Sequence, residues 1–138
     1  MKKTIFITGA TSGIGKATAE VFAKQGHRLI ICGRRKEVLD NLQIQLSNFT
    51  DVYSLVFDVR NQQEVQNAIN SLPEDWKNID VLVNNAGNAH GLEPISDANI
   101  SDWDAMIDGN VKGLLYVSQP IIKLMKANNS GHIVNISS

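Results

Sequence analysis

A glycine-rich stretch near the N-terminus, residues 8–15 (TGATSGIG), has the residue types and the spacing to bind a phosphorylated ligand. Gly9 permits a tight turn, Gly13 lets the backbone approach a pyrophosphate, and Gly15 lets a helix pack closely on a strand. The helix that follows would offer unpaired N–H groups and an electropositive end. The spacing differs from the commoner G-x-G-x-x-G, and no Gly-Lys-Ser/Thr follows as in a Walker loop. A plain strand-to-helix turn is the alternative interpretation.

Short apolar runs that alternate with amphipathic segments must position this loop. The runs predict strands over residues 4–8, 28–32, 52–57, 81–84 and 132–136, and several are the continuous Val/Ile/Leu stretches typical of parallel strands. Between them, apolar residues spaced by three, four and seven predict helices with one buried face each. These faces consist of Ile14, Ala17, Val21 and Phe22; of Leu39, Leu42 and Leu46; and of Val65, Ala68, Ile69 and Leu72.

The order of these elements predicts an α/β fold. A βαβαβ pattern continued by another βαβ unit indicates a doubly wound parallel sheet, the Rossmann arrangement, with strand order 3-2-1-4-5. Residues 1–138 then form one domain, and the open edge of the fifth strand indicates that C-terminal strands are missing. We expect Gly26 to cap the end of the first helix, and Asn61 and Ser101 to cap the starts of later ones. The ligand site is predicted at the switch point between strands 1 and 4.

Five motifs, in this order along the chain, resemble the short-chain dehydrogenase/reductase family: TGATSGIG, Asp58-Val59, NNAG at residues 84–87, MIDGNVKG and GHIVNISS. The resemblance implies a dinucleotide-dependent oxidoreductase in which Asp58 and Val59 contact the adenine. Asp58 could instead be a turn acid beside Arg60 and Asn61, and the NNAG asparagines could be partly structural. The other cofactor-binding residues that the resemblance implies are Gly9, Thr11, Ser12, Gly13, Ile14, Gly15, Asn85, Ala86 and Gly87.

The end of the second predicted strand favours NADP over NAD as the cofactor. NAD-binding domains of this type usually place Asp or Glu there to accept a hydrogen bond from the ribose 2′-hydroxyl. Here Gly33 is followed by Arg34 and Arg35, whose guanidinium groups can bind a 2′-phosphate. The alternative is that the two arginines form a solvated helix start.

Asn110 falls on the apolar stripe of a long predicted helix. A buried carboxamide without partners costs about 1–3 kcal/mol, so a partner is expected. The resemblance implies that Asn110 holds a water in a proton relay; a core asparagine that bonds backbone and distorts the helix is the alternative. The family also commonly forms homo-oligomers through this helix, residues 101–127. The stripe consists of Trp103, Met106, Ile107, Val111, Leu114, Leu115, Ile121, Ile122 and Met125.

Ser138 matches the catalytic serine of the family, which would hydrogen-bond the substrate carbonyl. The family's acid/base pair lies in a YxxxK motif, and neither Tyr53 nor Tyr116 begins one. We therefore predict that these 138 residues alone do not turn over substrate. A non-catalytic, truncated NADP-binding or assembly module is the alternative.

Bulk composition excludes several other function classes. The chain is 43% hydrophobic and 20% charged with a formal net charge of −1, which is typical of one soluble globular domain. Nucleic acid and membrane partners are not expected, because there is no basic stripe and no apolar run long enough to span a bilayer. No His, Cys or carboxylate spacing suits a metal, and the single cysteine, Cys32, reads as a buried strand residue. A cytoplasmic location is predicted.

Three further segments resemble the serine and 3-hydroxy acid dehydrogenase branch of the family: SLPEDWKNIDVLVNNAG, GLEP and DWDAMIDGNVKGLLY. Enzymes of that branch oxidise a small β-hydroxy acid, or reduce its semialdehyde, with NADP. Gly109 departs from the threonine expected before Asn110. The predicted function is hydride transfer between NADP(H) and a small hydroxy or carbonyl substrate.

Overall fold

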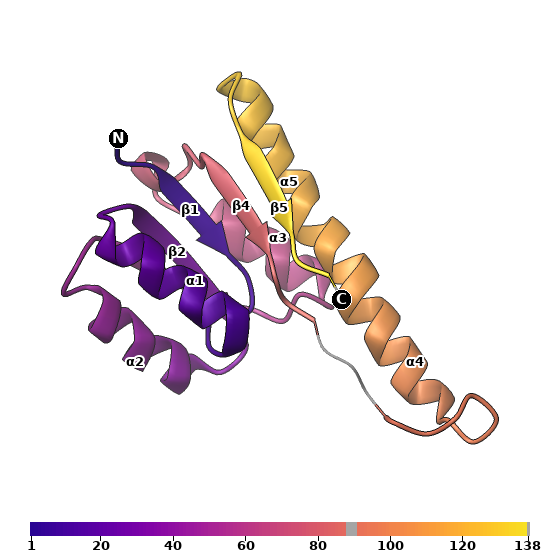
Figure 1. The fold of residues 1–138 in the computed structure, drawn as a ribbon. Helices are drawn as coiled ribbons and strands as arrows, with labels where there is room; N and C mark the ends of the chain where they lie inside the picture. The colour runs from indigo at the N-terminus through magenta and orange to yellow at the C-terminus, as the bar shows by residue number, and fades with distance from the viewer. Residues whose placement is uncertain (88–90, 138) are drawn as a thin grey trace.

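The computed structural model describes residues 1–87 and 91–137. It contains one parallel five-stranded sheet with the order β3-β2-β1-β4-β5, as predicted (Figure 1). Each predicted strand agrees with an observed one to within one residue at its ends. The strands are β1 (Thr4–Ile7), β2 (Arg28–Gly33), β3 (Val52–Val56), β4 (Val81–Asn84) and β5 (His132–Asn135).

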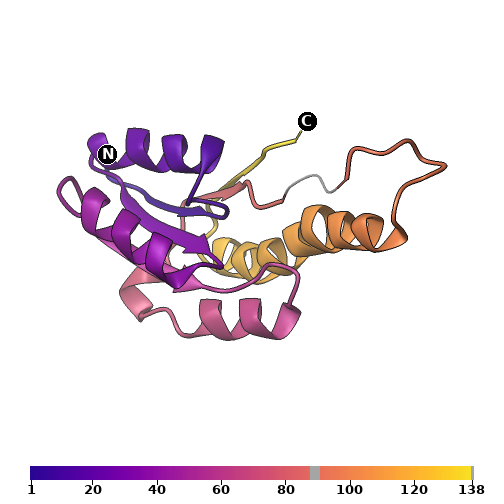
Figure 2. The same cartoon turned by 90° about the horizontal axis from the view of Figure 1, so that it is seen from below.

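Helices cover both faces of this sheet, so the doubly wound arrangement is confirmed (Figure 2). The helices are α1 (Gly13–Lys24), α2 (Lys36–Leu46), α3 (Gln62–Asn70), α4 (Ile100–Ile107) and α5 (Gly113–Ala127). Side chains alternate between the faces along each strand: Ile5 and Ile7 pack with α1 and α2, whereas Phe6 packs with α3 and α5. This alternation between two apolar layers explains why the strands read as continuous apolar runs.

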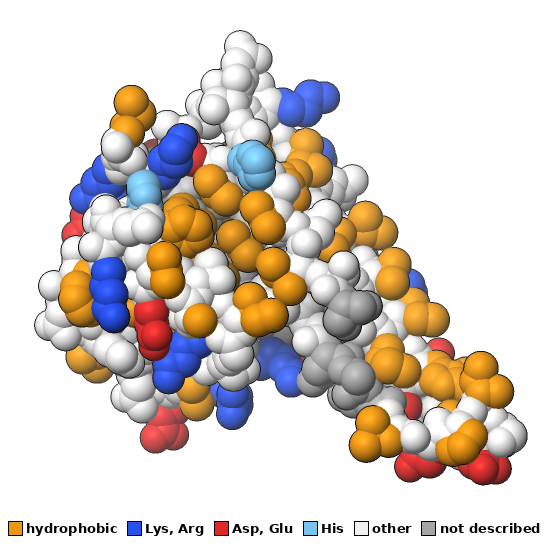
Figure 3. All heavy atoms as spheres, viewed as in Figure 1, with side chains coloured by type: hydrophobic (Ala, Val, Ile, Leu, Met, Phe, Trp, Pro, Cys, Tyr) orange, Lys and Arg blue, Asp and Glu red, His pale blue; other side chains and the backbone are white. Residues whose placement is uncertain are grey.

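The buried face of α1 differs from the prediction. Gly15, Ala19 and Ala23 are buried, whereas Ile14 is 59% and Val21 54% exposed. Small residues let the helix backbone lie close to the sheet, and Ile14 and Val21 therefore turn away from it. Phe22, which was also predicted on the buried face, is partly buried against the core. Figure 3 views the face of the sheet that carries α1. It shows hydrophobic side chains gathered there over β1, β4 and β5.

Two of the three predicted helix caps are confirmed. Gly26 has φ +83 and follows the last turn of α1, and the Asn61 side chain accepts a hydrogen bond from Glu64 N at 3.1 Å. The Ser101 prediction is wrong, because α4 begins at Ile100, two residues earlier than a cap at Ser101 requires. Asn99 caps it, and its side chain accepts a hydrogen bond from the backbone N–H of Ser101 at 3.0 Å.

The long helical segment after β4 is not one regular α-helix. A π-helical turn, η2 (Asp108–Lys112), joins α4 to α5, and α4 extends away from the sheet (Figures 1 and 2). In the part of the chain that the structure describes, no helix is both long and apolar enough to span a membrane.

Candidate nucleotide-binding site

A cavity of about 280 Å³ lies at the carboxyl ends of the strands. It joins the loop after β1, the end of β2, the segment after β3, the loop after β4 and one side of the α4–η2 segment. This is the switch point where a doubly wound sheet binds its ligand. The predicted cofactor residues that line it are Gly9, Thr11, Ser12, Arg34, Arg35, Asp58, Val59, Ala86 and Gly87.

Four predicted cofactor residues do not line the cavity: Gly13, Ile14, Gly15 and Asn85. Gly13 and Ile14 lie in the first turn of α1, which carries no acidic side chain, so the electropositive helix end is not neutralised. Gly9 and Gly13 have φ +61 and +56, the left-handed conformation that favours glycine. The loop geometry therefore fits the predicted anion-binding turn.

Gly15 and Asn85 hold the two loops of the site together. A Cβ at Gly15 would overlap the carbonyl oxygen of Gly9, so only glycine fits there without a shift of the loop. The Asn85 side chain donates to the same Gly9 oxygen at 3.1 Å. Thr8 Oγ1 accepts hydrogen bonds from the backbone N–H groups of Asn85 at 2.9 Å and Ala86 at 3.0 Å. The loop after β4 is thus fixed against the glycine loop.

Asn84, the first asparagine of NNAG, has a different set of partners. Its side-chain amide donates to Ser118 Oγ at 2.9 Å and to Asn135 Oδ1 at 3.0 Å. Asn84 and Ser118 are buried, so these bonds satisfy polar groups removed from water. These bonds connect β4 to α5 and β5, which fits the partly structural interpretation of this asparagine.

Arg60 and Thr8 line the cavity although sequence reasoning missed both as site residues. The Arg60 guanidinium pairs with both carboxylate oxygens of Asp58, with Nη2–Oδ2 at 2.7 Å and Nε–Oδ1 at 3.0 Å. The hydrogen bond from Arg60 is the main cause that lowers the pKa of Asp58, and the charge of Arg34 contributes. The available signal for this ion pair was a basic residue two positions after Asp58, but that residue was interpreted as part of a turn.

Asn110 is exposed, so the predicted burial of its carboxamide is wrong. It lies in the π-helical turn, and its Oδ1 is so close to Gly87 that a Cβ there would overlap it. The helix distortion fits the alternative interpretation of Asn110, and the proximity to the NNAG loop places it near the predicted nicotinamide end. Its role in a proton relay stays a prediction, and Ser138 lies outside the described residues.

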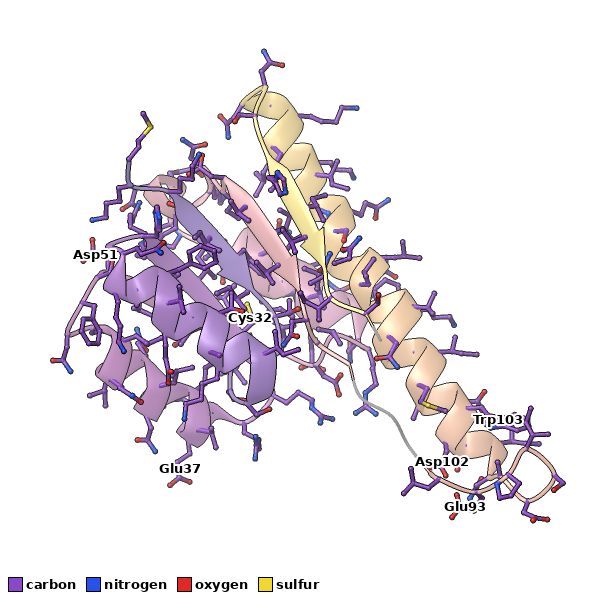
Figure 4. All side chains as sticks on the ribbon, viewed as in Figure 1. Cys32, Glu37, Asp51, Glu93, Asp102 and Trp103 are labelled. Atoms are coloured by element: carbon purple, nitrogen blue, oxygen red, sulfur yellow. The ribbon has the colours of Figure 1, made fainter. Side chains whose placement is uncertain are left out.

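The apolar stripe that carries Asn110 is also only partly buried. Ile121 and Met125 are buried against the sheet, whereas five other members of the stripe are exposed. Figure 4 shows Trp103 on the far part of α4, away from the sheet. The exposed members are Trp103, Ile107, Val111, Leu115 and Ile122.

Cys32 lies in the centre of the molecule at the end of β2 (Figure 4). It is fully buried, and burial raises the pKa of its thiol well above the usual value. The thiol is therefore protonated at neutral pH, which fits a packing role. Across residues 1–87 and 91–137, no three His, Cys, Asp or Glu side chains gather to hold a metal.

The geometry agrees with comparisons with known proteins. A family model described as short chain dehydrogenase matches residues 3–138. The NADP-dependent 3-hydroxy acid dehydrogenase YdfG of Escherichia coli O6:H1 is 45% identical over 134 residues, which cover 97% of this chain and 53% of that protein. Sulfoacetaldehyde reductase 2 of Chromohalobacter salexigens is 42% identical over 139 residues, covering 100% of this chain and 55% of that protein.

Solved structures agree as well. The closed form of serine dehydrogenase complexed with NADP+ has a TM-score of 0.90 at 44% identity, covering 98% of this chain and 54% of that one. NAD+-bound xylitol dehydrogenase has a TM-score of 0.94 at 30% identity, covering 99% of this chain and 53% of that one. The predicted similarity to the serine and 3-hydroxy acid dehydrogenase branch is confirmed, although the chain spans about half the length of these relatives. With its sheet order, its glycine loop and a family match over residues 3–138, the chain belongs to the short-chain dehydrogenase family.

Proposed function

We propose that this chain is the cofactor-binding half of a cytoplasmic, NADP-dependent short-chain oxidoreductase. The observation that carries the proposal is the cavity in which Gly33, Arg34 and Arg35 lie beside the glycine loop. At this position a carboxylate would repel a 2′-phosphate, whereas two guanidinium groups attract one. The NADP dependence of the YdfG relative supports the same cofactor. The fold alone does not decide it, since a neighbour of similar TM-score is bound to NAD+.

In this proposal each loop holds one part of the cofactor. The first turn of α1 and the glycine loop bind the pyrophosphate, while Asp58 and Val59 face the adenine. Ala86 and Gly87, which add little side-chain bulk, lie beside the nicotinamide ribose. The nicotinamide supplies or accepts the hydride when the cofactor is bound. Asn110 and Ser138 act on the substrate side, as the family resemblance implies.

The proposed substrate is a small hydroxy acid such as serine or a 3-hydroxy acid, or the corresponding carbonyl compound. Two names support it: the YdfG relative is a 3-hydroxy acid dehydrogenase, and a structural neighbour is a serine dehydrogenase. We propose that the 138 residues alone bind NADP without turnover, because they lack the YxxxK acid/base pair. A binding or assembly module without catalysis is the competing proposal for the parent protein.

Titration calorimetry of the purified 138-residue chain with NADP+ and with NAD+ tests this function. We expect NADP+ to bind at least about tenfold more tightly, because charge-assisted hydrogen bonds to the 2′-phosphate contribute about 1.5–3 kcal/mol each. Addition of serine or 3-hydroxypropionate to the same samples should give no NADPH absorbance at 340 nm above that of a no-protein blank.

The variant Arg34→Gln/Arg35→Gln supplies the control for cofactor choice. It should lose most of the affinity for NADP+ and keep that for NAD+ within about threefold, since only the 2′-phosphate partner is removed. Equal losses for both dinucleotides would mean that the arginines only support the loop. Turnover by a sample whose intact mass matches 138 residues would contradict the proposed lack of catalysis.

We also propose that two copies pair through residues 101–127. Ile107, Val111 and Leu115 form an apolar stripe that is 51%, 53% and 57% exposed. Asp102 and Asp104 lie at one end of the α4–α5 segment, whereas α5 carries Lys123 and Lys126 but no acid. An antiparallel pair of these segments would bring opposite charges together and bury the stripe.

Sedimentation velocity of the chain tests this pairing. Leu115→Lys should convert a dimer into a monomer, because two lysines would be buried against each other across the two-fold axis. Ile44→Lys is the matched control, since Ile44 is an apolar residue of α2 that is 70% exposed. A wild-type chain that stays monomeric at 100 µM would refute the pairing.

A further inference from the structure

Arg60 and Asp58 form an ion pair within the cavity that holds Arg34 and Arg35. Besides the two guanidinium contacts, the backbone N–H of Arg60 donates to Asp58 Oδ1 at 3.0 Å. The pair also borders a second, wider hollow of about 740 Å³ that extends to Asp108. Since the two residues are separated by only one position, the pair forms within one turn, and it does not hold distant elements together.

The carboxylate of Asp58 creates an electrostatic problem for a 2′-phosphorylated ligand. Asp58 is the only acidic residue that lines the cavity within residues 1–87 and 91–137. The positive charge of Arg34 is near enough to lower the pKa of Asp58, so the two charges act on each other. A phosphate dianion held by Arg34 would therefore also experience the negative charge of Asp58.

We propose that Arg60 is a cofactor-selectivity residue: it neutralises the Asp58 carboxylate and thereby lets Arg34 and Arg35 attract a 2′-phosphate without opposition. The inference rests on the proposed NADP preference and deepens it. It gives Arg60 a role through Asp58, since Nε and Nη2 of its guanidinium bind that carboxylate.

Asp108, the other negative charge near Arg60, has a different ion-pair partner. Asp108, on the π-helical turn, contributes to the field at Arg60 but has its own ion pair with Lys112 at 3.6 Å. Asp58 has no cation other than Arg60 within ion-pair distance in the described part of the chain. Loss of Arg60 would thus leave the uncompensated negative charge on Asp58.

The test is calorimetric titration of the 138-residue chain and its variants with NADP+ and NAD+, which differ only in the 2′-phosphate. Arg60→Gln should weaken NADP+ binding about tenfold and change NAD+ binding by less than about twofold. The double variant Arg60→Gln/Asp58→Asn should recover the wild-type NADP+/NAD+ affinity ratio, because it removes the opposing charge as well. Asp58→Asn alone should keep or raise that ratio.

Lys77→Gln is the matched control, because it also removes one positive charge and one ion pair. Lys77 pairs with Glu74 at 3.1 Å and lies outside the cavity. It should leave the ratio unchanged, and thermal unfolding checks that every variant is folded. A double variant that stays selectivity-impaired would overturn the inference, because Arg60 would then contact the phosphate itself. Equal weakening of both ligands by Arg60→Gln would overturn it too. A wild-type chain without preference for NADP+ would refute the proposed function instead.

Discussion

Replacing Gly15 with alanine should strongly weaken dinucleotide binding by this chain. The added Cβ would overlap the carbonyl oxygen of Gly9 and meet the side-chain amide of Asn85, so the glycine loop must move away from α1. That movement would break the hydrogen bond from Asn85 to Gly9 and displace the N–H groups that are proposed to face the pyrophosphate. We expect NADP+ affinity to fall at least about a hundredfold, since a misplaced anion site loses several charge-assisted hydrogen bonds.

The Gly15→Ala change should also lower the free energy of unfolding. An alanine inside a helix normally stabilises it by roughly 0.5–1 kcal/mol relative to glycine. Here overpacking should outweigh that gain and lower the free energy of unfolding by about 1–3 kcal/mol. Urea unfolding and calorimetry measure the two effects. Val21→Ala, a change at an exposed, uncharged position further along α1, is the control. It should leave NADP+ affinity unchanged and the free energy of unfolding within about 0.7 kcal/mol of the wild-type value. A folded Gly15→Ala variant with wild-type affinity would refute the proposed role of the loop.

The strand order and the strand positions could be predicted because they depend on local signals. Buried parallel strands need apolar side chains on both faces, and this requirement gives continuous runs such as residues 28–32. The handedness of the crossovers then leaves few topologies, and the glycine loop and NNAG fall at the same edge. The fold therefore explains why the glycine loop and the NNAG loop lie at one site.

The buried faces of α2 and α3 agree with the predicted ones, but the face of α1 does not, because burial depends on what lies opposite. The spacing of Ile14, Ala17 and Val21 is helical, yet the close approach of α1 to the sheet requires Gly15, Ala19 and Ala23 at the contact. Periodicity alone cannot separate an apolar stripe that packs inside the domain from one that faces outward. The exposed stripe of α4 and α5 shows the same limit.

Arg60 shows why a site can hold residues that no motif predicts. Its type is ordinary for a turn before a helix, and only the bond geometry shows that it pairs with Asp58 through both carboxylate oxygens. The Asn110 prediction failed for a related reason. The spacing assumed a regular α-helix, whereas the π-helical turn rotates the residues that follow Ile107.

Replacing Gly87 with alanine should destabilise the chain and displace Asn110. Gly87 has φ +140, a conformation that costs other residues about 1–3 kcal/mol, and the new Cβ would overlap Asn110 Oδ1. With overpacking of about 1–3 kcal/mol added, we expect the free energy of unfolding to fall by about 2–6 kcal/mol. Urea unfolding measures the loss. The side-chain amide resonance of Asn110 in a ¹⁵N-labelled sample should shift if the carboxamide moves.

The double variant Gly87→Ala/Asn110→Ala separates the two causes, because it removes the overlap and keeps the backbone strain. It should recover about 0.5–3 kcal/mol relative to the sum of the single changes, the range expected for residues in direct contact. Gly91→Ala is the comparison, since Gly91 has φ +77 and a Cβ there would come nearest, among the described residues, to the ends of the Glu93 and Asp102 side chains, which can move. Strictly additive effects of the changes at positions 87 and 110 would show that Gly87 does not position Asn110. Recovery would identify this glycine as the residue that lets the loop after β4 and the π-helical turn meet.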